Sequence, residues 1–276
     1  MTNVSAAPTV ERVISLYGTV ARRKDLTAVG ITSWQISRAL SDGRIQLVAP
    51  GYYGLPRANA IDVMLAKLKG GRSCLSEARR RGLWVIEEPE RVHIAVHHGH
   101  PVPGCVVHRI RGRQSLMDVL HQCVKCGSEL EALCVLESAI VLKRCTFAQL
   151  RRSFAGRQDA AGRAIISMID PQSQSIVETI ARYLIRQAGF NVQSQFFVKG
   201  VGHLDLLVDG VLAVETDGET YHNTGDGWTE DLRRDNLLVL NGLWCLRIPA
   251  RMVLDNPETM LKWVQQALTI IDAKPR

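Results

Sequence analysis

Residues 203–217 read His-Leu-Asp-Leu-Leu-Val-Asp-Gly-Val-Leu-Ala-Val-Glu-Thr-Asp, two apolar runs that carry acidic residues and flank an Asp-Gly pair. This pattern predicts a β-hairpin with strands at 203–208 and 211–217. Glu215 and Asp217 are two positions apart, so they leave the same face of the second strand. A carboxylate in an apolar strand is costly unless a cation compensates it, so Asp205 and Glu215 are candidate metal ligands.

The loop of this hairpin decides whether the two acids share a face. Glycine at position 210 favours a three-residue loop at 208–210 with a positive φ at Gly210. Asp205 then lies opposite Ala213, and Glu215 is its diagonal neighbour on the same face. A two-residue turn would instead place Asp205 opposite Val214, with Glu215 facing away.

The segments around the hairpin alternate between helical and strand patterns from about Pro171 onward. Ser175 can cap a helix that ends at Gly189, and the strand 192–198 precedes the hairpin. A helix at about 229–240, a strand at 244–248 and a helix at about 257–270 follow it. The predicted order is helix, three strands, helix, strand and a closing helix.

Two carboxylates form an oxygen-rich site that suits Mg²⁺ or Mn²⁺, which can polarise a phosphodiester. The segment 175–270 resembles the PD-(D/E)xK nuclease superfamily, and within it the very-short-patch-repair endonuclease group. The resemblance rests on Glu178, Asp205, Glu215-x-Asp217-Gly218, Tyr221-His222 and Arg233-x-Asp235.

The resemblance implies a role for each of these residues. Asp205 and Glu215 would bind the metal, and Glu178 would support water beside it. The usual lysine of the superfamily is Asp217 here, so His222 is the expected general acid or base. Arg233 would stabilise charge on the phosphate.

Each assignment has a structural alternative. Glu178 could be a surface residue at a helix start, and Asp217 could accept hydrogen bonds in the turn before Gly218. His203 could be a polar group at a strand end. Arg233 and Asp235 could form a plain surface ion pair.

Residues 9–56 carry a different pattern, with helices predicted at 10–17, from 21 to near Gly30 and at 33–40, and strands at 44–48 and 52–55. Three helices followed by a β-hairpin are typical of a winged helix-turn-helix domain. The third helix would enter the major groove of duplex DNA. The residues presented to DNA would be Arg22, Arg23, Lys24, Ser33, Trp34, Gln35, Arg38 and Arg44. Gln35 and Arg38 could contact base edges and the other basic residues phosphates, whereas a small helical domain for protein contacts is the alternative.

The stretch Gly30-Ile-Thr-Ser-Trp-Gln-Ile-Ser-Arg-Ala-Leu-Ser-Asp-Gly-Arg-Ile, together with Pro50-Gly-Tyr-Tyr, resembles the N-terminal domain of AbiE-type antitoxins. These are bacterial transcriptional autoregulators of toxin–antitoxin operons. The resemblance extends over a helix near 72–84 and strands at 92–96 and 106–110, and residues 115–169 look helical. We therefore expect a winged helix at 1–57, an antitoxin-like α/β domain at 58–170 and a nuclease-like domain at 171–276, a multidomain α+β and α/β fold.

Cysteine and histidine clusters give weaker signals. Cys123 and Cys126 form a CxxC motif next to His121, but no second pair with zinc-ligand spacing follows, so buried helix cysteines are favoured over zinc or redox chemistry. The run His97-His98-Gly-His100 is interpreted as a solvated loop.

The distribution of charge separates the two ends of the chain. Of its 34 Lys and Arg and 27 Asp and Glu, residues 171–276 contain 10 basic and 13 acidic residues, which leaves 24 and 14 for residues 1–170. A basic front attracts DNA, although a solvated basic surface gives the same balance.

The class and partners follow from these features. The 276 residues contain no long apolar run and no signal-peptide pattern, so we expect a soluble cytoplasmic protein with no membrane partner. Double-stranded DNA is the expected ligand, and a toxin protein and a second copy of the chain are candidate partners. Two functions remain open: a DNA-guided, metal-dependent endonuclease, or a transcriptional regulator whose nuclease-like domain is inactive.

Overall fold

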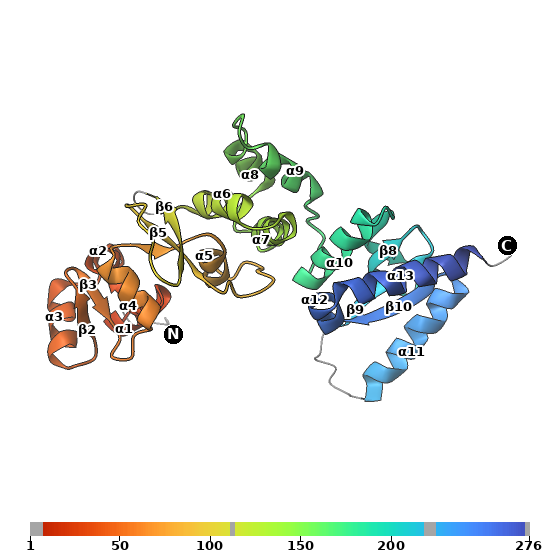
Figure 1. Ribbon diagram of the computed structural model, residues 1–276. Coiled ribbons are helices and arrows are strands. Elements are labelled where there is room, and N and C mark those ends of the chain that lie inside the picture. Colours follow the sequence, from red (N-terminus) through yellow and green to blue (C-terminus); the bar gives the residue numbers. More distant parts are fainter. Residues whose placement is uncertain (1–7, 111–113, 218–224, 274–276) are drawn as a thin grey trace. The chain divides into compact units, whose positions relative to one another are not determined.

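The computed structural model describes residues 8–110, 114–217 and 225–273, and it combines helices with three small sheets (Figure 1). The chain forms two compact units, one of residues 1–77 with 89–114 and one of residues 78–88 with 115–276. The mixed α/β class is therefore confirmed, whereas the finer division into three domains stays a prediction. Among the described residues, no helix has the length and apolar character needed to cross a membrane.

The first unit begins with three short helices and a three-stranded sheet in the order β1-β3-β2. The elements are α1 (Val10–Leu16), β1 (Val20–Arg22), α2 (Arg23–Ala28), α3 (Ser33–Ser41), β2 (Gln46–Ala49) and β3 (Tyr52–Gly54). Val13, Ile14 and Leu26 form the centre of its apolar core. The helix predicted from 21 to near Gly30 is wrong at its start, because Ala21 is buried in β1 opposite Tyr53 of β3.

The remainder of the first unit is built on a second sheet, in which β5 is the central strand. Its elements are α4 (Ala60–Lys67), β4 (Gly71–Arg72), β5 (Val92–Val96), β6 (Cys105–Arg109) and the start of α5 (Cys74–Arg80), whose residues from Ala78 onward belong to the second unit. Strands β5 and β6 are parallel, and His93 pairs with Val106. Asp62 joins the two parts of the unit, because it accepts a 2.9 Å hydrogen bond from the Thr19 backbone N–H and forms an ion pair with Arg72.

Helices dominate the start of the second unit. They are α6 (Leu116–Cys126), α7 (Glu129–Val141), α8 (Phe147–Ser153) and α9 (Ala160–Met168). Cys123 of the CxxC motif is fully buried on α6, as its helical spacing predicts, whereas Cys126 is exposed, so the expectation of buried cysteines is wrong for Cys126. His121 stacks on Phe154 with ring centroids 3.8 Å apart. Gly162 of α9 is essential to this packing, since a Cβ atom there would lie 2.1 Å from the Phe154 ring.

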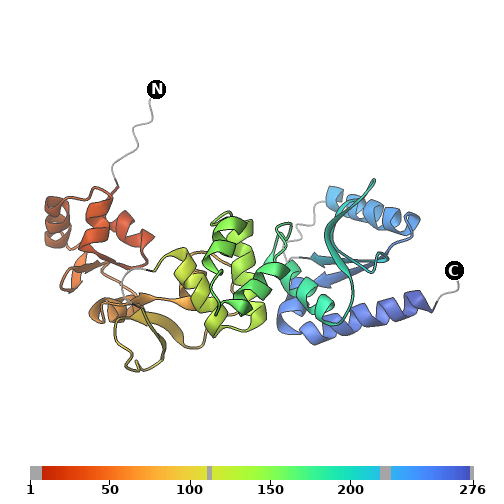
Figure 2. The ribbon, with the colours of Figure 1, turned by 90° about the horizontal axis from the view of Figure 1, so that it is seen from above.

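The rest of the second unit confirms the element order predicted after Pro171. It comprises α10 (Ile176–Gln187), β7 (Val192–Val198), β8 (Gly202–Val208), β9 (Leu212–Asp217), α11 (Gly225–Leu240), β10 (Trp244–Pro249), α12 (Ala250–Asp255) and α13 (Pro257–Asp272). The sheet order is β10-β9-β8-β7, with β10 parallel to β9 and the other pairs antiparallel. Helices α10 and α13 pack on one face and α11 on the other (Figure 2).

A buried ion pair joins α7 to α10. Glu137 is fully buried, and its carboxylate lies 2.5 Å from the guanidinium of Arg182, whose side chain is 1% exposed. The same carboxylate accepts hydrogen bonds from the Thr179 hydroxyl at 2.5 Å and from the Asp170 backbone N–H at 2.7 Å. The pair therefore fixes α10 against the helices that precede it.

Removing one member of this pair should be strongly destabilising. We expect Glu137→Leu to lower the free energy of unfolding by about 3–5 kcal/mol, because the Arg182 charge stays buried without its partner. The double variant Glu137→Leu/Arg182→Met should recover part of the loss, since no buried charge remains. Urea unfolding measures both.

The matched control is Glu88→Ala, in which an acid that is 76% exposed beside Arg79 is removed. This change should stay within about 0.5 kcal/mol of the parent protein. A Glu137→Leu variant as stable as the control would show that the buried pair does not hold α10 in place.

Candidate functional site

The hairpin of β8 and β9 has its loop one residue further along the chain than predicted. Gly210 has a φ of +73°, as predicted, and Asp209 also has a positive φ, of +47°. Val208 pairs with Leu212 and Leu206 with Val214, so the three-residue loop is 209–211. The predicted pairing of Asp205 with Ala213 is wrong, because Ala213 pairs with Leu207, and the pairing of β8 with β9 ends at Leu206 and Val214, before Asp205.

Asp205 is half-buried at a break in the alternation of β8. Leu206 packs in the core under α10 and α13, and Leu207 packs in the core under α11. Leu204 joins the core under α11 as well, although regular alternation would place it with Leu206. Asp205 Oδ2 accepts hydrogen bonds from the Thr216 backbone N–H at 2.8 Å and from its hydroxyl at 3.0 Å.

Glu178 lies at the start of α10 and is only 5% exposed, so the surface-residue alternative is wrong. Ser175 caps the helix by accepting from the Glu178 N–H, and its hydroxyl donates to Glu178 Oε1 at 3.0 Å. Burial raises the pKa of Glu178, and the charge of Asp205 raises the pKa further, whereas hydrogen bonds from Gln174, Ser175 and Gln195 lower it. The carboxylates of Glu178 and Asp205 therefore act on each other electrostatically.

Gln195 interrupts β7 beside these acids. It has a φ of +51°, and the pairing passes from Ser194 to Phe196 around it. Its side chain donates to Glu178 Oε2 at 3.2 Å, and its carbonyl oxygen lies 2.8 Å from Nδ1 of His203. His203, near the start of β8, is therefore a polar group at a strand end, which is the structural alternative given for it in the sequence analysis.

Glu215 lies on β9 beside arginine side chains. Its Oε1 is 3.5 Å from Nη2 of Arg234, and their side chains are 14% and 30% exposed. In the parallel pairing of β9 and β10, Glu215 is opposite Arg247, which itself lies 3.5 Å from Asp235. Arg234, which the sequence analysis did not select, is therefore the arginine of α11 that approaches the predicted acid.

The other residues predicted for this site divide into two groups. Arg233 is exposed and donates to the Gly200 carbonyl oxygen at 3.0 Å. Asp217 is the last residue of β9, but its side chain is outside the described part of the structure. His222 lies in the segment 218–224, which is also outside it.

In the first unit, α3 presents an aromatic and basic surface. Trp34 is 65% exposed, and the guanidinium carbon of Arg38 is 5.2 Å from the centre of its ring. Arg23 donates to the Ser33 hydroxyl at 2.9 Å, and Lys24 is exposed on α2. These five residues, Arg23, Lys24, Ser33, Trp34 and Arg38, are called the α3 surface below.

Three residues predicted to contact DNA are engaged within the protein. Gln35 Oε1 accepts from the Thr32 backbone N–H at 2.8 Å, which completes a capping box at the start of α3. Arg22 is paired with Asp25 at 2.7 Å. Arg44 is paired with Glu11 and Asp42, and its hydrogen bond to Glu11 raises its pKa.

One cluster of potential metal ligands was missed by the sequence analysis. Within the described residues, three or more metal-binding side chains converge at a single place, which contains Cys74, His93 and His108 but neither Asp205 nor Glu215. The signal was a histidine in each of two predicted strands and a cysteine near the start of a predicted helix.

Comparisons with known proteins give no relative: no family model matches the sequence, and neither a curated protein nor a solved structure matches it.

The raised pKa of Glu178 predicts a pH dependence of stability. A carboxyl whose pKa lies above its ordinary value of 4.5 contributes stability that is fully present below that pH and is lost as the pH rises through the folded-state pKa. Glu178→Gln cannot ionise, so its stability relative to the parent should increase from acid to neutral pH. Denaturant unfolding over a pH series measures this, and the exposed Glu88→Gln serves as the control. A constant difference would contradict the raised pKa.

Proposed function

We propose that this chain is a DNA-binding protein whose second unit carries a metal-dependent endonuclease site, with Mg²⁺ or Mn²⁺ as the cofactor. The observation that carries the proposal is the placement of Asp205, which accepts hydrogen bonds from Thr216, the neighbour of Glu215 on β9, and whose charge raises the pKa of Glu178. Like charges that are brought together and half-buried are costly unless a cation compensates them. The element order α10-β7-β8-β9-α11-β10 agrees with the nuclease fold proposed from the sequence.

The residues around the acids fit a hard cation in part. The hydrogen bonds described for Asp205 all go to Oδ2, so Oδ1 is the oxygen that we propose for the metal. The ion pair of Glu215 with Arg234 is long and partly exposed, and such pairs contribute about 0–1 kcal/mol, so a divalent ion could displace it. Mg²⁺ bound there would polarise a phosphodiester and help ionise the attacking water.

The chain's own groups would position the substrate. Arg234, released from Glu215, would pair with the phosphate. Glu178, held by three hydrogen bonds and with a raised pKa, is suited to exchange a proton with water at the site. His222, as proposed from the sequence, would be the second group for proton transfer.

We propose a winged helix-turn-helix in the first unit, with the α3 surface as the DNA contact. Support comes from Trp34 and Arg38, an exposed aromatic and a cation that share one face of the helix. Lys24 and Arg23 at the start of α2 would neutralise phosphates. Gln35, Arg22 and Arg44 would stabilise the domain instead of reading DNA, because each is engaged within it.

The second candidate function is a non-catalytic transcriptional regulator with a toxin protein or a second copy of the chain as partner. The observation in its favour is the arginine beside Glu215, because a permanent ion pair there would leave Asp205 as a single ligand. The cleavage experiment below separates the two functions.

The proposal predicts cleavage that depends on both acids. With Mg²⁺ or Mn²⁺, the parent protein should nick or cut supercoiled, linear or single-stranded DNA. Asp205→Asn and Glu215→Gln should each lower the rate by about 10²-fold or more, since each removes a charge from the cation site. Gel assays under single-turnover conditions measure the rates.

Asp209→Asn is the matched control, because Asp209 is an exposed acid in the loop of the same hairpin and asparagine tolerates its positive φ. The control should cleave like the parent. Equal cleavage by the Asp205 and Glu215 variants would overturn the site. A parent protein that binds DNA and never cleaves it would establish the regulator instead.

The α3 surface predicts a separate effect on binding. Arg38→Ala should weaken binding to duplex DNA by about 1–3 kcal/mol without changing the stability of the unit, since Arg38 is exposed. Fluorescence anisotropy over a salt series measures the loss, with the exposed Arg152→Ala of α8 as the control. Unchanged affinity and salt dependence in Arg38→Ala would exclude this face as the contact.

A further inference from the structure

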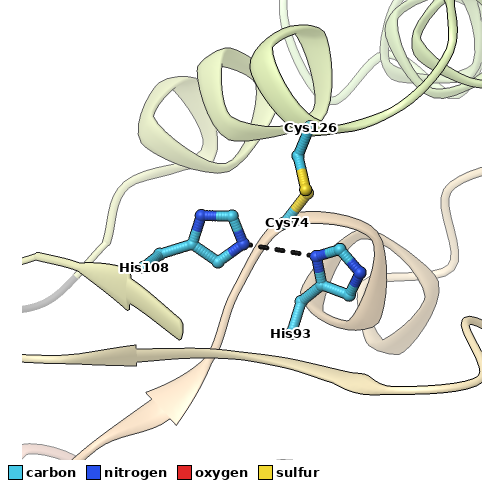
Figure 3. Close-up of side chains that lie close together, drawn as sticks. All are labelled: Cys74, His93, His108 and Cys126. Atoms are coloured by element: carbon cyan, nitrogen blue, oxygen red, sulfur yellow. Dashed lines mark hydrogen bonds between the residues drawn. The ribbon is translucent and has the colours of Figure 1, made fainter. Parts of the chain in front are cut away.

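Three potential metal ligands converge in the first unit from three different elements. Cys74 begins α5, His93 lies on β5 and His108 on β6, and their ligand atoms lie within 4.8 Å of one another. Figure 3 draws these side chains with Cys126, which ends α6 in the second unit. We propose that Cys74, His93 and His108 form a zinc site, independent of the acidic site on β8 and β9.

The spacing of the two imidazoles agrees with a shared tetrahedral ion. Nδ1 of His93 and Nε2 of His108 are 3.2 Å apart, and the rings are stacked with 25° between their planes (Figure 3). Two nitrogens that each lie about 2.0–2.1 Å from one zinc ion at the tetrahedral angle are about 3.3 Å apart. The observed distance therefore suits two lone pairs directed at one cation as well as it suits a hydrogen bond.

The surroundings also suit a zinc site. Cys74 is fully buried and His93 is 7% exposed, so neither is available to bulk water as a simple surface polar group. A thiolate and two imidazoles are the ligands of a borderline-soft ion such as Zn²⁺, whereas Mg²⁺ prefers oxygen. A fourth ligand, from water or another side chain, would complete the tetrahedron.

The backbone holds the three ligands in place. The Ser76 hydroxyl accepts a 3.0 Å hydrogen bond from the His93 N–H, and the Ser73 N–H donates to the His93 carbonyl oxygen at 2.8 Å. These two bonds tie the start of α5 to β5. Cys74, the first residue of α5, has a φ of +49°, a backbone conformation that non-glycine residues rarely adopt. Zinc would therefore cross-link α5, β5 and β6 of the first unit.

The full chain, purified without chelators, should contain about one zinc ion per molecule by atomic emission. Cobalt substitution should give a thiolate-to-cobalt charge-transfer band that weakens in Cys74→Ser. His93→Ala and His108→Gln should each lower zinc affinity about 10-fold or more in competition with a chromogenic chelator.

The histidine run in the loop after β5 provides the control, because it could hold adventitious zinc. The double variant His98→Ala/His100→Ala should keep the parent's zinc content and affinity. Loss of zinc from that variant, or parental affinity in His93→Ala and His108→Gln, would overturn the proposal.

A variant that fails to fold still leaves a decisive measurement on the parent chain. Parent protein that has been stripped with chelator should regain its metal and its resistance to unfolding when zinc is added. Parent protein that contains no zinc when isolated and binds none afterwards would also overturn the proposal. None of these readouts depends on DNA cleavage.

Discussion

Glu137 and Arg182 place a full ion pair where neither charge reaches water. Burying such a pair is costly unless hydrogen bonds satisfy its remaining polar groups. The Thr179 hydroxyl and the Asp170 N–H satisfy the carboxylate, whereas Nη1 of Arg182 is buried without a hydrogen-bond partner among the described residues. The contact fixes α10 in position and register on α7, and the apolar core continues from Cys134 of α7 to Ile180 of α10. Helix α7 and the sheet after residue 170 therefore share one core.

The position of α10 in turn sets the environment of the acidic site. Thr179 and Arg182 face α7, while Glu178, one residue earlier than Thr179, is buried beside Asp205. If α10 rotated by even part of a turn, Glu178 would move away from the Gln195 amide of β7 and from Asp205 of β8. The buried Arg182–Glu137 pair therefore holds α10 in the position that keeps Glu178 beside Asp205. This accounts for the three buried polar residues of α10, which are Glu178, Thr179 and Arg182.

Local signals predicted the elements well and the long-range contacts poorly. The Asp-Gly pair and the apolar runs beside it predicted the β8–β9 hairpin and the positive φ of Gly210. Asp209 also has a positive φ, and the sequence pattern could not show which three residues form the loop. No local pattern marks Glu137 as one half of an ion pair, because its partner Arg182 is 45 residues away. The capping box of Thr32 and Gln35 was visible as a motif, although Gln35 was assigned to DNA. Cys74, His93 and His108 each have an ordinary local context, and only the pairing of β5 with β6 brings them together.

The interruption at Gln195 has a consequence for the outermost strand of the sheet. An edge strand with a regular backbone can recruit a strand from another molecule and so start aggregation. In β7 the ladder is broken at Gln195, whose carbonyl oxygen is occupied by His203, although Phe197 beside it is 61% exposed. The positive φ of Gln195, whose amide reaches Glu178, therefore makes β7 a less regular template for intermolecular strand pairing.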